Sequence, residues 1–160
     1  MTEWETFEQA RDTINSLEPY KTRIEEVNAK GIDPYKNPGI SLLSFSDILQ
    51  RFASSSAMRQ EDFDPGIRDC LRAGKRCTGY SIVASRIRKV RLGNFWLDSL
   101  NFHREVDTTG WRFNALVILI DGLVVYTLYS GQPNVREREI IRNPLGPLQT
   151  WGEQAPRLVQ

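Results

Sequence analysis

The chain contains 160 residues and carries a formal net charge of +1, with 40% hydrophobic and 26% charged residues. This composition is typical of one soluble globular domain, and the nearly balanced charge argues against a general attraction to nucleic acid or anionic lipid. One histidine and two cysteines are too few for an ordinary four-ligand zinc site. We therefore expect neither a metal nor another cofactor.

The first residues are acidic and polar. The start MTEWETFEQ has no basic segment followed by an apolar one, so the sequence predicts no signal peptide and, by default, a cytoplasmic protein. A periplasmic or envelope-associated location is the alternative if the natural start lies upstream. No apolar run is long enough for a transmembrane segment.

Helices are predicted in the first half of the chain. Apolar residues recur at helical spacing from Phe7 to Leu17, and Pro19 separates this helix from a second one over about 19–29. Residues 31–41 hold two prolines and two glycines and predict a loop.

Two further short helices follow. Ser44 and Asp47 form a variant of the capping box in front of a helix over 45–53, and Gly74 ends another helix over about 66–74. Cys70 lies in this last helix and Cys77 follows it. A disulfide between them is sterically plausible, and two reduced thiols are the alternative.

The clearest local signal is the stretch Trp111–Gly131. Two runs rich in Val, Ile, Leu and Tyr flank Asp121-Gly122, which predicts an antiparallel hairpin with a two-residue turn. The hairpin is expected to have one face that is apolar throughout, bearing Trp111, Phe113, Ala115, Val117, Leu119, Val124, Tyr126 and Leu128. The other face is apolar near the turn and polar at its far end.

We expect the apolar face to meet the N-terminal helices and form the main core, with contributions from Phe7, Ile14, Ile24, Ile48 and Phe52. The opposite face should be covered only near the turn, by a return segment over 134–149 that begins as a short helix. An earlier strand is predicted from Thr78, with a turn at Gly93-Asn94.

A candidate binding patch follows from the predicted register. A four-residue loop at Asp107–Gly110 would pair a strand over about 100–106 with the strand that begins at Trp111. This register gathers five hydrogen-bonding side chains suited to an anion, a polar ligand or a partner: His103, Glu105, Arg112, Asn114 and Tyr129. A solvated sheet face with a cross-strand ion pair explains the same residues without a ligand, and a shift of one residue would disperse them.

The order of elements predicts an α+β protein, with N-terminal helices packed on one face of a three- to four-stranded antiparallel meander. We expect one domain over residues 1–150, with a helical part to about 76, a sheet part over about 78–131 and a return segment over 132–150. Residues 151–160 are predicted to be a tail. The order is similar to that of small bacterial outer-membrane assembly lipoproteins of the SmpA/OmlA type, and this resemblance is one of architecture alone.

The sequence contains no catalytic, phosphate-binding or metal-binding motif, so an enzyme is not favoured. We favour a non-enzymatic binding or assembly module with a protein partner, such as an accessory subunit of a bacterial envelope complex. One alternative is a small enzyme or ligand-binding domain that uses the polar sheet face around His103. A second is a nucleic-acid adaptor through the basic run Arg86–Arg91, although a charged edge strand explains this run more simply.

Overall fold

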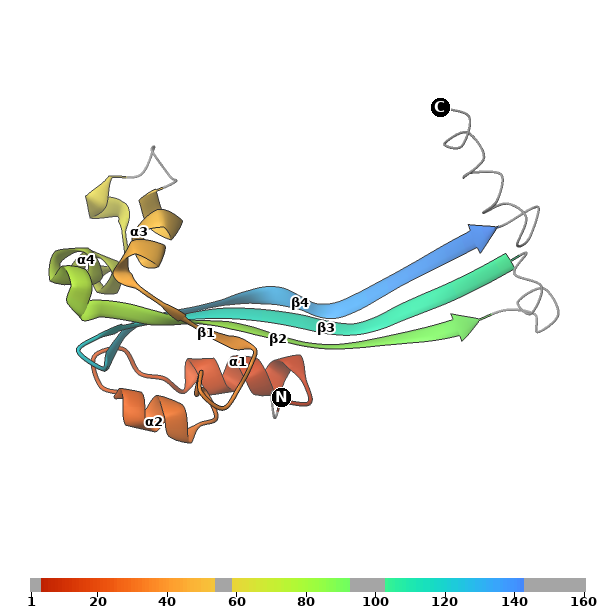
Figure 1. Cartoon of the computed structure of the whole chain (residues 1–160), viewed down its shortest axis with the longest axis horizontal. Helices are drawn as coiled ribbons and strands as arrows, with labels where there is room; N and C mark the ends of the chain where they lie inside the picture. The colour runs from red at the N-terminus through yellow and green to blue at the C-terminus, as the bar shows by residue number, and fades with distance from the viewer. Residues whose placement is uncertain (1–3, 54–58, 93–102, 143–160) are drawn as a thin grey trace, which may run out of the picture. The chain divides into compact units, whose positions relative to one another are not determined.

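The computed structural model describes residues 4–53, 59–92 and 103–142. Within them the chain forms four α-helices and one four-stranded antiparallel sheet, in which each strand lies beside the next one along the chain (Figure 1). The predicted α+β class and the antiparallel meander are confirmed. The elements are α1 (Phe7–Asn15), α2 (Ile24–Ala29), β1 (Ile40–Leu43), α3 (Phe45–Ala53), α4 (Pro65–Ala73), β2 (Cys77–Leu92), β3 (His103–Ile120) and β4 (Leu123–Arg142).

The chain divides into two compact units. The first comprises Met1–Arg86 and Trp111–Pro133, and the second comprises Ile87–Gly110 and Asn134–Gln160. The first unit contains the four helices together with β1 and part of each longer strand. The described part of the second unit consists of the remaining parts of β2, β3 and β4. The predicted turn at Gly93-Asn94 and the tail at 151–160 lie outside the described residues.

Local sequence signals account for the ends of α3 and α4. The Ser44 hydroxyl and backbone N–H both donate to the Asp47 carboxylate, at 2.8 and 2.9 Å, as the capping-box pattern predicted. The Asp64 carboxylate accepts from the N–H of Gly66, and Pro65 occupies the first turn of α4. Both helices lie within one residue of their predicted positions.

Helix α2 is shorter than predicted because the preceding residues pair with β4 instead. The N–H of Tyr20 donates to the carbonyl of Val124 at 2.6 Å, and the N–H of Val124 donates to Thr22 at 2.9 Å. Residues 19–21 form a turn, in which Tyr20 has a φ of 65° and the N–H of Thr22 donates to the carbonyl of Glu18 at 2.9 Å, so the predicted start of a helix at Pro19 is wrong. Strand β1 was also missed, because its four residues were assigned to a loop and to the approach to α3.

Helices cover both faces of the sheet in the first unit. In Figure 1, α1 and α2 lie on one side of the strands and α3 and α4 on the other. Alternate residues of β3 enter the two cores: Phe113 and Val117 pack in the core on the α1 side, whereas Leu116 and Ile118 pack in the core on the α3 side. This is the two-sided alternation expected of a strand.

The core on the α1 side is the one that the sequence predicted. Its buried members on the helices and on β3 and β4 are Phe7, Ala10, Ile14, Leu17, Val27, Trp111, Phe113, Ala115, Val117, Leu119 and Val124. Ile48 and Phe52 were expected here, but they pack in the opposite core with Ile67, Cys70 and Cys77. Thus α3 and α4, rather than a C-terminal return segment, cover the second face near the turn.

Two predicted connections are wrong because the strands are longer than expected. Asp107–Gly110 is not a hairpin loop, since β3 continues through it from His103 to Ile120. The segment after Gln132 is not a helix, since β4 continues to Arg142. The helix was predicted from Asn134, yet the alternating charges of this segment suit a strand with two exposed faces equally well.

The predicted hairpin turn is confirmed. Asp121 and Gly122 both have positive φ, 50° and 78°, as a two-residue turn of this kind requires. The guanidinium of Arg76 donates to the Asp121 carboxylate, with Nε 2.9 Å from Oδ2, and so fixes the turn to the start of β2. This hydrogen bond lowers the pKa of Asp121 below its usual range.

The two cysteines form a disulfide in the structure. The Cα atoms of Cys70 and Cys77 are 5.2 Å apart, and both residues are fully buried in the core on the α3 side. The bond joins α4 to the first residue of β2. Of the two alternatives that the sequence left open, the structure contains the bridged one.

Strand β4 changes phase after Val125. Val125 packs in the core on the α3 side, and so does its neighbour Tyr126. Tyr129 instead stacks on Phe113 of the α1-side core, with ring centroids 6.0 Å apart. In strict alternation Val125 and Tyr129 would share a face, so we interpret the change as a β-bulge, in which one strand contains an extra residue.

The bulge lies where α4 approaches β4 most closely. A Cβ atom added at Gly66 would overlap the backbone oxygen of Val125 and lie 3.2 Å from the Cβ of Tyr126. Beyond this point, the predicted faces of β4 are exchanged. Tyr126 and Leu128 were expected on the face of Phe113, and this expectation is wrong.

Candidate functional site

The structure does not bring the five predicted patch residues together. Glu105 and Arg112 belong to the same strand, β3, and are therefore not cross-strand neighbours. Tyr129 lies on the α1 side against Phe113, whereas Asn114 lies on the α3 side. His103 is the first residue of β3, and its side chain is outside the described part of the chain.

Arg112 has a hydrogen-bond partner on β4. Its guanidinium donates to the side-chain oxygen of Gln132 on β4, at 3.0 Å. The register used to predict the patch is wrong, because it depended on a loop at 107–110 and on uninterrupted alternation in β4. Whether these five residues bind a ligand remains a prediction.

One of the five, Asn114, lines a hollow beside α3. This hollow has a volume of about 320 Å³ and lies over β2, β3 and β4 on the face that α3 covers only in part. We call it the α3 groove, and its lining residues are Arg51, Ser81, Val83, Asn114, Ala115, Leu116, Leu128 and Ser130.

The α3 groove combines apolar and hydrogen-bonding groups. Val83 and Leu128 are large apolar side chains that remain 57% and 50% exposed. Ser81, Asn114 and Ser130 place hydroxyl and amide groups around them, and Arg51 adds a cation from α3. These groups suit an apolar side chain that arrives with a polar backbone, and they include no nucleophile paired with a base.

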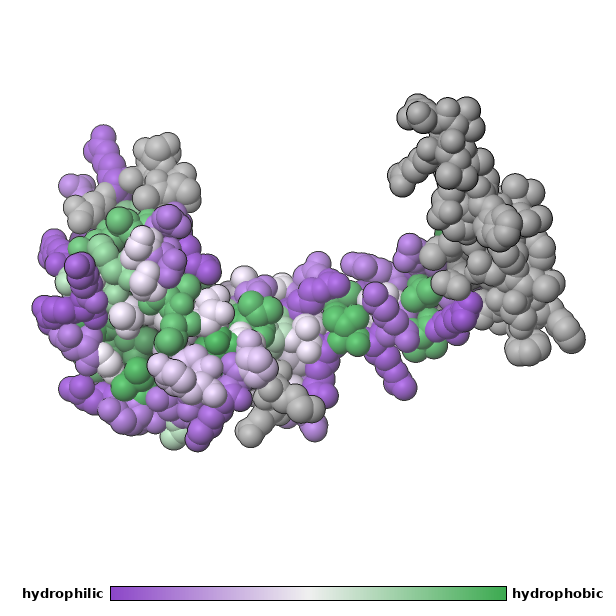
Figure 2. Space-filling view, viewed as in Figure 1, coloured by the Kyte–Doolittle hydropathy of each residue, from purple (hydrophilic) through white to green (hydrophobic). Residues whose placement is uncertain are grey.

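Sequence reasoning missed Val83 and Leu128 as site residues, for different reasons. Val83 has the opposite phase to the buried Tyr80 and Ile82, so alternation alone could have placed it on the α3 side. Leu128 could not be placed this way, because the bulge exchanges the faces before it. Figure 2 shows the surface from the same side as Figure 1, with groups of hydrophobic residues among hydrophilic ones.

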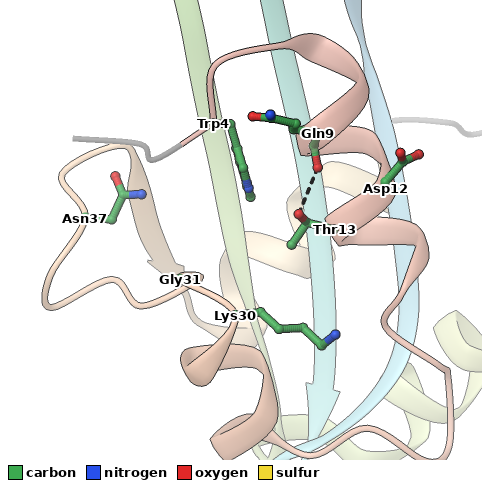
Figure 3. Close-up of a pocket in the computed structure, with 7 residues that line it drawn as sticks. All are labelled: Trp4, Gln9, Asp12, Thr13, Lys30, Gly31 and Asn37. Atoms are coloured by element: carbon green, nitrogen blue, oxygen red, sulfur yellow. Dashed lines mark hydrogen bonds between the residues drawn. The ribbon is translucent and has the colours of Figure 1, made fainter.

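A second pocket, of about 410 Å³, lies between α1 and the segment that follows α2 (Figure 3). Its polar side chains already stabilise the fold. The Thr13 hydroxyl donates to the carbonyl of Gln9, Lys30 donates to the Ser16 hydroxyl at 3.0 Å, and Asn37 accepts from a backbone N–H. We therefore regard this pocket as a packing junction and not as the best ligand site.

In the second unit, the clearest polar interaction joins β3 to β4. Arg138 donates to the Asp107 carboxylate, with Nε 2.9 Å from Oδ1. This hydrogen bond lowers the pKa of Asp107, and the same bond raises that of Arg138. Both groups are at the surface, so the pair supports strand register more than stability.

Residues 4–53, 59–92 and 103–142 contain no group of three His, Cys, Asp or Glu side chains that could hold a metal ion. No helix within these ranges is both long and apolar enough to span a membrane.

No protein-family model, curated protein or solved structure matches this chain.

Proposed function

We propose that this chain is a non-enzymatic binding or assembly module that receives a protein partner in the α3 groove. The observation that carries the proposal is the exposure of Val83 and Leu128 on a sheet face whose other half is covered by α3 and α4. Large apolar side chains that border a hollow, with polar groups around them, are typical of protein contact sites.

The size and lining of the groove indicate what it would accept. A volume of about 320 Å³ suits one or two side chains of a partner better than a cofactor. Val83 and Leu128 would contact the apolar part of such a side chain. Asn114 can both donate and accept, so its amide would bind a backbone group of the same partner.

In the same proposal, the chain is an accessory subunit of a bacterial envelope complex. The disulfide between Cys70 and Cys77 supports this location, because disulfides persist in oxidising compartments and are rare in the cytosol. Fractionation of the source cells, with thiols blocked before lysis, tests it. A bridged protein in the envelope or periplasm is expected, and a reduced protein in the cytosol would contradict this part of the proposal.

The alternatives have less support. A small enzyme or ligand-binding domain would use the patch around His103, two members of which, Asn114 and Tyr129, lie on opposite sides of the sheet. A nucleic-acid adaptor would use Arg86–Arg91, which alternate between the two sides of β2.

Photo-crosslinking tests the site. A benzoylphenylalanine residue placed at Asn114 should capture a defined partner in the source cells. The same residue placed at Leu42, which is 55% exposed but pairs with Tyr80 of the α1-side core, should not.

The double variant V83E/L128E should lose partner binding, because it places two charges at exposed apolar positions of the groove. The variant should fold, as judged by its circular dichroism, and lose the crosslink from Asn114. A partner that is captured equally well by this variant, or equally well from Leu42, would show that the contact lies elsewhere.

A further inference from the structure

Among the described residues, no strand pairs with one edge of β2 along its second half. Strand β1 pairs with β2 only from Ile40 to Leu43, opposite Gly79–Ile82, and the N–H of Val83 donates to Gly39 just beyond this ladder. In the described sheet the order is β1-β2-β3-β4, so from Ile87, where β2 enters the second unit, its only neighbour among the described strands is β3.

The backbone of this edge is oriented for pairing. Because the N–H of Val83 points toward the β1 side, the alternation of a strand directs the N–H and C=O groups of Ser85, Ile87 and Lys89 to that side as well. An extended polypeptide laid along the edge could exchange hydrogen bonds with them. Such strand addition is a common mode of peptide recognition.

The side chains of the edge give it a chemical preference. Residues 86–91 read Arg-Ile-Arg-Lys-Val-Arg, with four basic side chains and no acidic one. In the second unit, Arg88 points to one side of the sheet and Lys89 to the other. Arg86 belongs to the first unit and already donates to the carbonyl of Trp4 at 3.0 Å. All four basic side chains are exposed.

We propose that this edge of β2 binds an acidic, extended segment of a protein partner by strand addition. The inference rests on the proposed function and specifies a second contact and the chemistry of the partner. A strand seated on the edge has its own side chains on both sides, so acidic residues at successive positions would all meet cations. Opposite charges that face each other across strands are stabilising.

The same arrangement disfavours two other occupants. A nucleic acid on one side of the sheet would reach only the cations of that side, and no aromatic residue lies between them for base stacking. A second copy paired through the same edge would bring cations opposite cations, which is destabilising.

The test uses the full chain and a synthetic probe. The probe is an acetylated, amidated octapeptide with five glutamates and three valines, labelled for fluorescence anisotropy. The variant R88E/K89E should bind it at least tenfold more weakly than the wild type. The matched variant R72E/K75E carries the same change of charge at exposed positions on α4 and directly after it, before β2 begins, and it should bind within twofold of the wild type.

Backbone pairing is tested on the probe itself. Two methylated probes are compared, one with its odd-numbered peptide nitrogens methylated and one with its even-numbered ones. One of the two should lose binding and the other should keep it, because only alternate N–H groups of a strand face its neighbour. Loss of this difference would overturn strand addition, even if binding were still sensitive to charge.

Three further outcomes would overturn the proposal: no binding of the probe by the wild type, equal binding by R88E/K89E, or displacement of the probe by single-stranded DNA of equal charge at equal concentration. None of them bears on the α3 groove, whose test depends on Val83 and Leu128 and measures partner capture. Failure of the edge and failure of the proposed function are therefore distinguishable.

Discussion

Replacing Phe113 by alanine should remove the centre of the aromatic cluster under α1. Phe113 is fully buried, and its ring centroid lies 5.4 Å from that of Phe7, 5.8 Å from that of Trp4 and 6.0 Å from that of Tyr129. Truncation of a buried phenylalanine typically costs about 3–5 kcal/mol, including the cavity. Each aromatic pair contributes about 0.5–1.5 kcal/mol beyond area burial, so we expect a loss at the upper end, about 4–5 kcal/mol.

Urea unfolding followed by circular dichroism measures this loss, provided that the slope of the transition is unchanged. The control is Tyr35→Ala, because Tyr35 is 86% exposed and its loss should change the free energy of unfolding by less than about 0.5 kcal/mol. A double-mutant cycle with Phe7→Ala should give a coupling of about 0.5–1.5 kcal/mol. A loss below about 2 kcal/mol for Phe113→Ala, or a coupling near zero, would refute the packing of α1 on this face.

Three other predictions follow from the same structure. Replacing Cys70 and Cys77 by alanine opens a loop of eight residues and should cost about 2.5 kcal/mol in the chain-entropy relation, whereas reduction of the wild type with no loss of stability would contradict the bridge. Ser44→Ala removes the N-terminal cap of α3, whose hydroxyl accepts from the N–H of Asp47 and donates to its carboxylate, and should cost about 0.5–2 kcal/mol; Ser44→Thr keeps the hydroxyl and should preserve the cap. The hydrogen bond from Arg76 lowers the pKa of Asp121 in the folded chain, so this pair stabilises the fold above the ordinary carboxyl pKa of about 3.9, and the contribution is lost as the pH falls through the lowered value. Asp121→Asn should therefore unfold less steeply on acidification than the wild type, and identical acid transitions would show that the ion pair contributes nothing.

Local signals in the sequence were sufficient to predict several elements of the first unit. The helix after Ser44, the helix that contains Cys70 and the turn at Asp121-Gly122 each depend on side chains a few residues apart. Caps and tight turns are decided by backbone geometry over one or two turns of chain, so they can be predicted without knowledge of the tertiary structure. The apolar phase of β3 is equally local, and Phe113 lies on the predicted face.

The tertiary structure decided what covers each face and where each strand ends. The apolar face of α3, which contains Ile48, has the same sequence pattern as the apolar face of α1. Only the packed chain therefore shows that the two helices lie on opposite sides of the sheet. The close approach of α4 accompanies a bulge in β4 that moves Leu128 to the α3 groove and Tyr129 onto the other face. Because strand alternation has a period of two, one extra residue exchanges every face beyond it, and this is why the candidate patch was predicted on residues that the fold keeps apart.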